Sequence, residues 1–289
     1  MARKSGLILI AVLLAGFGAT ALSAQKSVTP APKSMLSYAD MADLALAAPI
    51  VAEVRVRRAS PLKGALAPGL QPGQQRYLVE ADVMALIRGA GGLPPRISYI
   101  LDVGLTAEGR SQKPGKSGHM IFAHPVAGRP EQLRLVAPDA QQPLSPDLAT
   151  VVRSILSSAQ GGDAPPRLLG IGQAFHVPGV LPGEGETQVF LEAADGRPLS
   201  LGIWRQQGRD VRWAVSPGEL VDERAAPPAR DTLAWYRLAC FLPRQLPAAS
   251  TAALAPAEAD AAARDYRVVI DGLGPCQRTR EKRNPAQNS

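Results

Sequence analysis

Aromatic residues, histidine and cysteine are all scarce in this chain. Of its 289 residues 4% are aromatic, and there are only three His and two Cys. So few rings leave few platforms on which bases can stack, and nucleic acid is therefore not an expected partner. Nucleophilic cysteine chemistry is not expected either, because a reactive Cys needs a nearby base and nothing marks the last histidine, His176, as that base.

Enzyme motifs are also missing or incomplete. No Gly-x-Ser-x-Gly elbow occurs. Residues 115–117 (GKS) match the end of a phosphate-binding loop, but Arg110 stands where that loop requires glycine. Ser60 and Lys63 have the Ser-x-x-Lys spacing of penicillin-binding enzymes, yet the Lys-Thr-Gly partner of that site is absent. We therefore expect no cofactor and favour a non-catalytic role.

The remaining candidates for chemistry are histidines and carboxylates. His119 and His124 lie five positions apart on one predicted strand, which places them on opposite faces and prevents them from sharing a metal ion. Glu184 and Glu186 fall in a glycine-rich loop, and nothing places two carboxylates across a cleft as a glycosidase requires. No metal site is therefore expected.

The N-terminus has the three-part layout of a secretory signal. Arg3 and Lys4 are followed by apolar or small residues over 6–22, and small residues then provide a cleavage site. We favour a signal peptide of residues 1–24, cut after Ala24. The mature chain is then expected to be periplasmic or secreted.

Two alternatives to this processing remain open. A cut after Ala21 also fits the small-x-small rule, and an uncleaved N-terminal anchor would need an apolar run of about this length. The region contains no Cys, so a lipid-modified N-terminus is not supported. No later segment is long and apolar enough to span a bilayer, so the mature chain is expected to have no transmembrane span.

The two cysteines agree with export. An even pair of Cys in an exported chain is usually bridged, so Cys240 and Cys276 are predicted to form a disulfide. Closing a loop of this size stabilises a fold by about 3 to 4 kcal/mol in the chain-entropy model.

Composition and length predict two domains between flexible ends. The fold class is expected to be mainly β (α+β): a five-stranded OB-like barrel flanked by helices, and a smaller, disulfide-closed β-meander domain with a helix. Basic residues near the C-terminus contribute much of the formal net charge of +7 and indicate a disordered tail. The expected parts are a leader (25–35), the barrel domain (36–162), the meander domain (167–276) and the tail (277–289).

Hydrophobic periodicity, turn residues and helix caps place the elements. Ser37 and Asp40 form a capping-box pattern before a short helix, and Ser145 caps a clear amphipathic helix that ends at the glycines 161–162. In the barrel domain, strands are expected over 50–58, 77–87, 97–103, 119–123 and 133–137. In the second domain we expect strands over 168–177, 188–193, 199–205, 211–215 and 266–270, a helix over 231–241 and low-complexity alanine over 248–263.

Residues 36–160 resemble the netrin-like module, an OB-type barrel shared with the tissue inhibitors of metalloproteinases. The resemblance rests on residues 43–44 with 50–54, on 77–89 and on 118–122, which look like the first helix-to-strand passage, the long second strand and the fourth strand. Those inhibitors bind the protease metal through an N-terminal Cys, and this chain has none there. The resemblance implies a fold that contacts proteins or glycans more often than it catalyses.

We therefore expect an exported envelope protein that binds a protein or glycan, with an envelope hydrolase, or an inhibitor of one, as alternatives. Trp204 is the candidate contact residue, because the apolar residues 199, 201 and 203 claim the other face of its strand. Packing of this ring against the neighbouring domain or the 231–241 helix is an equal alternative. The sequence indicates no oligomeric state.

Overall fold

The computed structural model describes residues 36–218 and 225–280, which form four α-helices, ten strands and two short 3₁₀ segments. In chain order they are α1 (Tyr38–Ala47), β1 (Ile50–Leu62), η1 (Gly64–Leu66), β2 (Gln74–Arg88), β3 (Arg96–Gly104), β4 (Gly118–Val126), β5 (Arg129–Leu135), β6 (Gln141–Pro143), α2 (Pro146–Ser158), β7 (Leu168–Pro178), β8 (Gly185–Ala193), β9 (Leu199–Arg205), β10 (Arg212–Ser216), α3 (Leu233–Ala239), η2 (Ala248–Thr251) and α4 (Pro256–Leu273).

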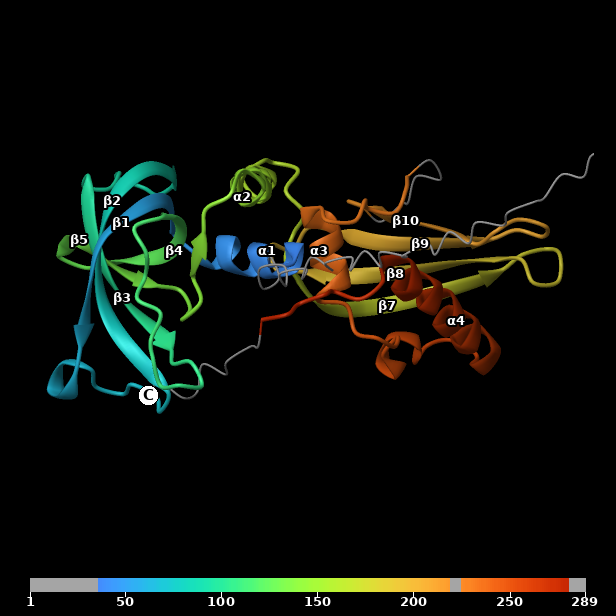
Figure 1. The fold of residues 1–289 in the computed structure, drawn as a ribbon. Helices are drawn as coiled ribbons and strands as arrows, with labels where there is room; N and C mark the ends of the chain where they lie inside the picture. The colour runs from blue at the N-terminus through green and yellow to red at the C-terminus, as the bar shows by residue number, and fades with distance from the viewer. Residues whose placement is uncertain (1–35, 219–224, 281–289) are drawn as a thin grey trace, which may run out of the picture. The chain divides into compact units, whose positions relative to one another are not determined.

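The first five strands close into a barrel (Figure 1). The strand order is β1-β2-β3-β5-β4, and β4 pairs back with β1 to complete the ring. All of these pairings are antiparallel except that between β3 and β5, so the barrel is mixed. The short strand β6 adds to β4 on its other side. The five-stranded barrel expected from the sequence is thus confirmed.

Alternation of side chains fills the barrel. Along β1, Ala52, Val54 and Val56 are buried, whereas Arg55 and Arg57 between them are exposed. Residues of the same period on the other strands complete this core, which includes Tyr99 on β3.

A second sheet contains β7 to β10 as a four-stranded antiparallel meander, and α4 packs against β7, β8 and β9. The strands expected at 168–177 and 199–205 are confirmed. The strand expected at 266–270 is wrong, because this segment belongs to α4. The buried residues of α4 recur at helical spacing and form one apolar stripe toward the sheet: Ala262, Asp265, Tyr266, Val269, Ile270 and Leu273.

One buried cluster joins the remaining helices to this sheet. It contains residues of α1, α2, α3 and α4 together with the α4-facing side of β8 and β9. Ser145 caps α2 through its hydroxyl, which accepts from the N–H of Leu148, and Pro146 opens the helix, as the sequence predicted. The predicted disulfide between Cys240, at the end of α3, and Cys276, after α4, is confirmed.

Several predictions concern residues outside the described ranges. The signal peptide and the leader lie entirely there, as do residues 281–289 of the predicted tail. The two-domain division at 163–167 stays a prediction. Within residues 36–218 and 225–280, no helix has the length and apolarity that crossing a bilayer requires.

Candidate functional site

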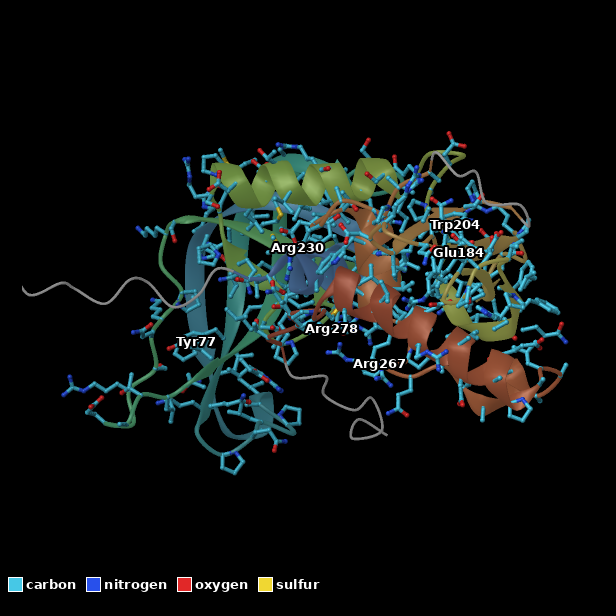
Figure 2. All side chains as sticks on the ribbon, turned by 90° about the vertical axis from the view of Figure 1, so that its right-hand side faces the viewer. Tyr77, Glu184, Trp204, Arg230, Arg267 and Arg278 are labelled. Atoms are coloured by element: carbon cyan, nitrogen blue, oxygen red, sulfur yellow. A yellow bond between two sulfur atoms is a disulfide. The ribbon has the colours of Figure 1, made fainter. Side chains whose placement is uncertain are left out.

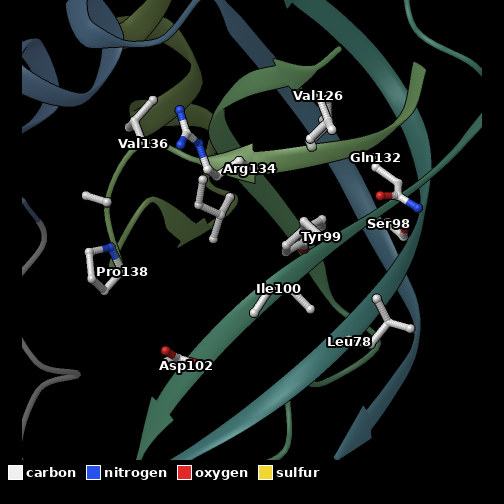
Figure 3. A pocket seen from close by; sticks show the side chains of 13 residues that line it. Leu78, Ser98, Tyr99, Ile100, Asp102, Val126, Gln132, Arg134, Val136 and Pro138 are labelled. Atoms are coloured by element: carbon white, nitrogen blue, oxygen red, sulfur yellow. The ribbon is translucent and has the colours of Figure 1, made fainter. Parts of the chain in front are cut away.

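A groove of about 570 Å³ lies in the barrel wall between β3 and β5 (Figure 3). Its lining is mostly aliphatic, and Ile100 on β3 is 43% exposed within it. Ligand sites in proteins are commonly hollows of this size with apolar walls and a few polar groups. The lining residues are Leu78, Ser98, Tyr99, Ile100, Asp102, Val126, Gln132, Leu133, Arg134, Leu135, Val136, Ala137 and Pro138.

The groove exists because β3 and β5 diverge after a short parallel pairing. They pair only at Ser98 with Gln132 and at Tyr99 with Leu133. Beyond this point β3 continues beside β2 to Gly104, whereas β5 stays with β4. Two strands that follow different neighbours separate, and the barrel wall opens between them.

The separation leaves a strand edge along β3. Its partner β2 runs antiparallel to it along 96–104. In an antiparallel ladder, alternate residues point their N–H and C=O groups to the paired strand and the others point theirs the opposite way. In the described part of the chain no strand pairs with β3 on its groove side beyond Tyr99. Some backbone groups of residues 100–104 therefore face the groove.

Few polar side chains line the groove, and one is already engaged. Asp102 accepts two hydrogen bonds from the guanidinium of Arg76, at 2.7 and 2.8 Å, and these bonds raise the pKa of Arg76. Arg134 on β5 is exposed, and among the described residues no ion pair joins it to a carboxylate. Because Arg76 offsets the charge of Asp102, Arg134 is the charge in the lining that no described ion pair offsets.

A C-terminal strap, defined here as residues 277–280, docks onto α1. Asp40 in the first turn of α1 is fully buried and accepts from the backbone and hydroxyl of Thr279, from the Arg280 N–H and from Ser37. Burial on its own would raise the pKa of Asp40, but the hydrogen bonds from Thr279, Arg280 and Ser37 outweigh it and lower the pKa. Residues 277–280, which the sequence placed at the start of a tail, thus contact α1 in the structure.

Charge pairs hold the strap on both sides of Asp40. Arg278 makes a bidentate pair with Asp43 at 2.7 and 3.0 Å, and its guanidinium lies 5.7 Å from the Tyr236 ring centre and 5.0 Å from that of Phe241. Such bidentate pairs combine strength with fixed geometry. Cys276 of the disulfide directly precedes this segment, so a covalent bond and the two carboxylates of Asp40 and Asp43 on α1 hold the strap.

The strap also reaches the groove. Arg280 makes a bidentate pair with Asp139 at 2.6 and 2.7 Å, and this contact lowers the pKa of Asp139. Asp139 directly follows Pro138 in the segment that closes one end of the groove. The end of the described chain therefore fixes one wall of the groove.

A second polar cluster is buried between α4 and the second sheet. Asp265 of α4 is fully buried, accepts from the Thr187 hydroxyl at 2.5 Å and pairs with Arg205. His176 contacts the same hydroxyl through Nδ1 at 2.8 Å. Although the residue types suggest a hydrolytic triad, the Thr187 hydroxyl has no exposed surface and is committed to Asp265. The cluster fixes α4 on the sheet.

The residues that the sequence suggested as candidates for binding or chemistry lie apart from one another in the structure. His119 points into the barrel, where burial lowers its pKa, and His124 points to the opposite face of β4.

Trp204 is half-buried on the sheet face opposite α4, beside Arg212, and Glu184 lies at the same end of the sheet (Figure 2). Trp213 on the neighbouring strand β10 packs against Gly272 of α4. No group of three or more His, Cys, Asp or Glu suited to a metal occurs among the described residues.

Sequence reasoning missed the groove and the strap. The sequence contained a signal for the strap, because its basic residues and the acidic Asp40 and Asp43 are complementary in charge.

Comparison with known proteins finds no family model that matches this sequence and no curated protein that matches it. The function must therefore be argued from the site itself.

Proposed function

We propose that the mature chain is an exported envelope protein that binds a protein or glycan through the groove between β3 and β5. The observation that carries this proposal is the groove: a hollow of about 570 Å³ with aliphatic walls and a solvent-exposed Ile100. The barrel holds these walls on strands, so the site is preformed and little ordering is needed on binding.

Export is supported by the N-terminal sequence and by the disulfide. Residues 1–24 have the layout of a secretory signal. The Cys240–Cys276 bond would persist in an oxidising compartment outside the cytoplasm.

The barrel supports a binding role by its topology. The order β1-β2-β3-β5-β4 with closure onto β1, and α1 before and α2 after it, favours an OB-like, netrin-like module. Barrels of this type serve as platforms for partners, and their function lies in the site rather than in the fold. Metalloprotease inhibition through an N-terminal Cys is not part of the proposal, since that residue is absent.

Export is tested first, by fractionating the native host and measuring the mass of the chain. We expect a periplasmic or secreted protein that begins at Gln25, or at Leu22 if the cut follows Ala21. An intact N-terminus in the cytoplasm would remove the localisation from the proposal.

Binding is tested by cross-linked capture from cell envelopes with two matched variants of the tagged mature protein. Ile100→Arg places a charge in the groove, and Met84→Arg places the same charge at another exposed position of the barrel, where Met84 is 52% exposed. We expect Ile100→Arg to lose its partner and Met84→Arg to keep it. Equal capture by both variants, or turnover of a chromogenic ester or glycoside by the purified protein, would contradict the proposal.

A further inference from the structure

We infer that the groove takes an extended segment of a partner polypeptide, which adds as a strand along the open edge of β3. This inference rests on the proposed function and names the chemistry of its partner. The parallel pairing of β3 and β5 stops at Tyr99 with Leu133, yet β3 runs on for five further residues to Gly104. The groove is thus a place in the barrel where one strand is missing its neighbour.

Backbone chemistry favours a peptide in this place. The groove-facing N–H and C=O groups of residues 100–104 are arranged with the period of a strand, which only another extended chain matches at every step. Strand edges are places where a second chain readily adds. A hydrogen bond to a partner replaces one to solvent, so each contributes a modest net gain.

The side chains that line the groove suit a peptide ligand better than a sugar ligand. Tyr99 is the one aromatic residue among the described residues that line the groove, and it is 2% exposed, belongs to the barrel core and donates its hydroxyl proton to Gln141 at 2.6 Å. Sugar rings are usually covered by flat aromatic faces, whereas aliphatic walls such as Leu78, Ile100 and Val126 suit the apolar side chains of a strand.

The charges at the groove indicate which kind of peptide it would bind. Arg134 lines the groove, and Asp102 across from it is neutralised by its pair with Arg76. A guanidinium without a carboxylate partner attracts an acidic side chain. We therefore assign to the groove a segment that alternates apolar residues with polar ones and carries an Asp or Glu near Arg134.

The test uses linear peptides of about ten residues, displayed as a random library and selected on the disulfide-bonded mature protein. The selected peptides are then synthesised with single N-methyl groups, each of which removes one backbone N–H. We expect every second position to weaken binding about fivefold and the positions between to have little effect, because only alternate N–H groups face β3. Amide exchange at residues 100–104 should slow when the peptide binds.

Matched protein variants locate the site. Ile100→Arg should weaken binding at least about tenfold, Met84→Arg should not change it, and Arg134→Gln should weaken only peptides that carry an acidic residue. Far-UV circular dichroism and melting verify that each variant is folded; if Ile100→Arg does not fold, Arg134→Glu takes its place as the disrupting change.

The outcomes separate this inference from the proposed function. A flat N-methyl profile, or peptides that bind Ile100→Arg unchanged, overturns strand addition. If the groove instead binds envelope oligosaccharides in an Ile100-dependent manner, strand addition is wrong while the binding function stands. If neither peptides nor oligosaccharides depend on Ile100, both proposals fail.

Discussion

Replacing Asp40 by asparagine tests whether the C-terminal strap is held by buried charge. The carboxylate of Asp40 accepts from Ser37 in the capping box of α1 and from Thr279 and Arg280 in the strap. An asparagine has one acceptor oxygen and turns an NH₂ group toward donors that previously met an oxygen. Hydrogen bonds to a charged group contribute about 1.5 to 3 kcal/mol each and do not add fully, so we expect a loss of about 3 kcal/mol.

The loss should be visible in melting and in proteolysis. For a folded unit of this size about 3 kcal/mol corresponds to a fall in Tm of about 6 to 12 °C. Trypsin should also cut faster after Arg278 and Arg280, because the strap is released before the rest unfolds. Asp163→Asn, at an exposed loop position, is the matched control and should leave both readings unchanged.

The pH dependence gives an independent reading of the same contact. The pKa of Asp40 is lower in the folded protein than in the unfolded chain, so its contribution is complete above the unfolded value of about 4 and is lost as pH falls through the folded value. The gap between wild type and Asp40→Asn should therefore shrink below about pH 4. A variant that melts within about 1 °C of wild type at neutral pH, with unchanged strap cleavage, would refute this reasoning.

Three further changes probe the rest of the fold. Reducing the Cys240–Cys276 bond, or replacing both residues by Ser, should cost about 4 kcal/mol for a separation of 36 residues, as measured by denaturant unfolding; unchanged unfolding midpoints would show that the bond contributes nothing. Asp265→Asn should cost about 3 to 5 kcal/mol, since it leaves buried donors on the second sheet without a charged acceptor, and a melting curve equal to wild type would count against this. Gly272→Ala normally strengthens a helix by about 1 kcal/mol, but here the new methyl group would lie 2.8 Å from the Trp213 ring nitrogen. We expect a net loss of about 1 to 3 kcal/mol with a changed Trp fluorescence, and a higher Tm would contradict the packing described.

Local chemistry explains which elements the sequence revealed. The helix after Ser145 has a hydroxyl cap, a proline at its first position and an apolar stripe, and all three signals agree. The strand over 199–205 is equally clear because its apolar residues alternate between glycine-containing turns.

The error at α4 has a physical cause. Val268, Val269 and Ile270 form a short β-branched run, which favours a strand when it is considered alone. The alanine-rich segment before it is a strong helix former, and the buried positions continue at helical spacing from Ala262 to Leu273. A longer window that joined the two segments would have predicted the helix.

The groove could not be predicted from local pattern. It depends on how far β3 and β5 pair, and these strands are not neighbours in the sequence. The alternation that identified each strand says which side chains face the core and nothing about where two strands separate. The export signal and the contact role of Trp204 stay predictions, because the first lies outside the described residues and no observation tests the second.

The contact between Arg280 and Asp139 also bears on the order in which the protein matures. The two residues are 141 positions apart, so the barrel strands leave the ribosome long before the arginine that fixes the groove wall. The Arg280–Asp139 pair can form only after synthesis has passed Arg280, and the strap gains its covalent tie when Cys276 is oxidised with Cys240. A chain whose synthesis has not passed Arg280 would thus present the groove without the ion pair at Asp139, and a still reduced chain would lack the covalent tie next to the strap.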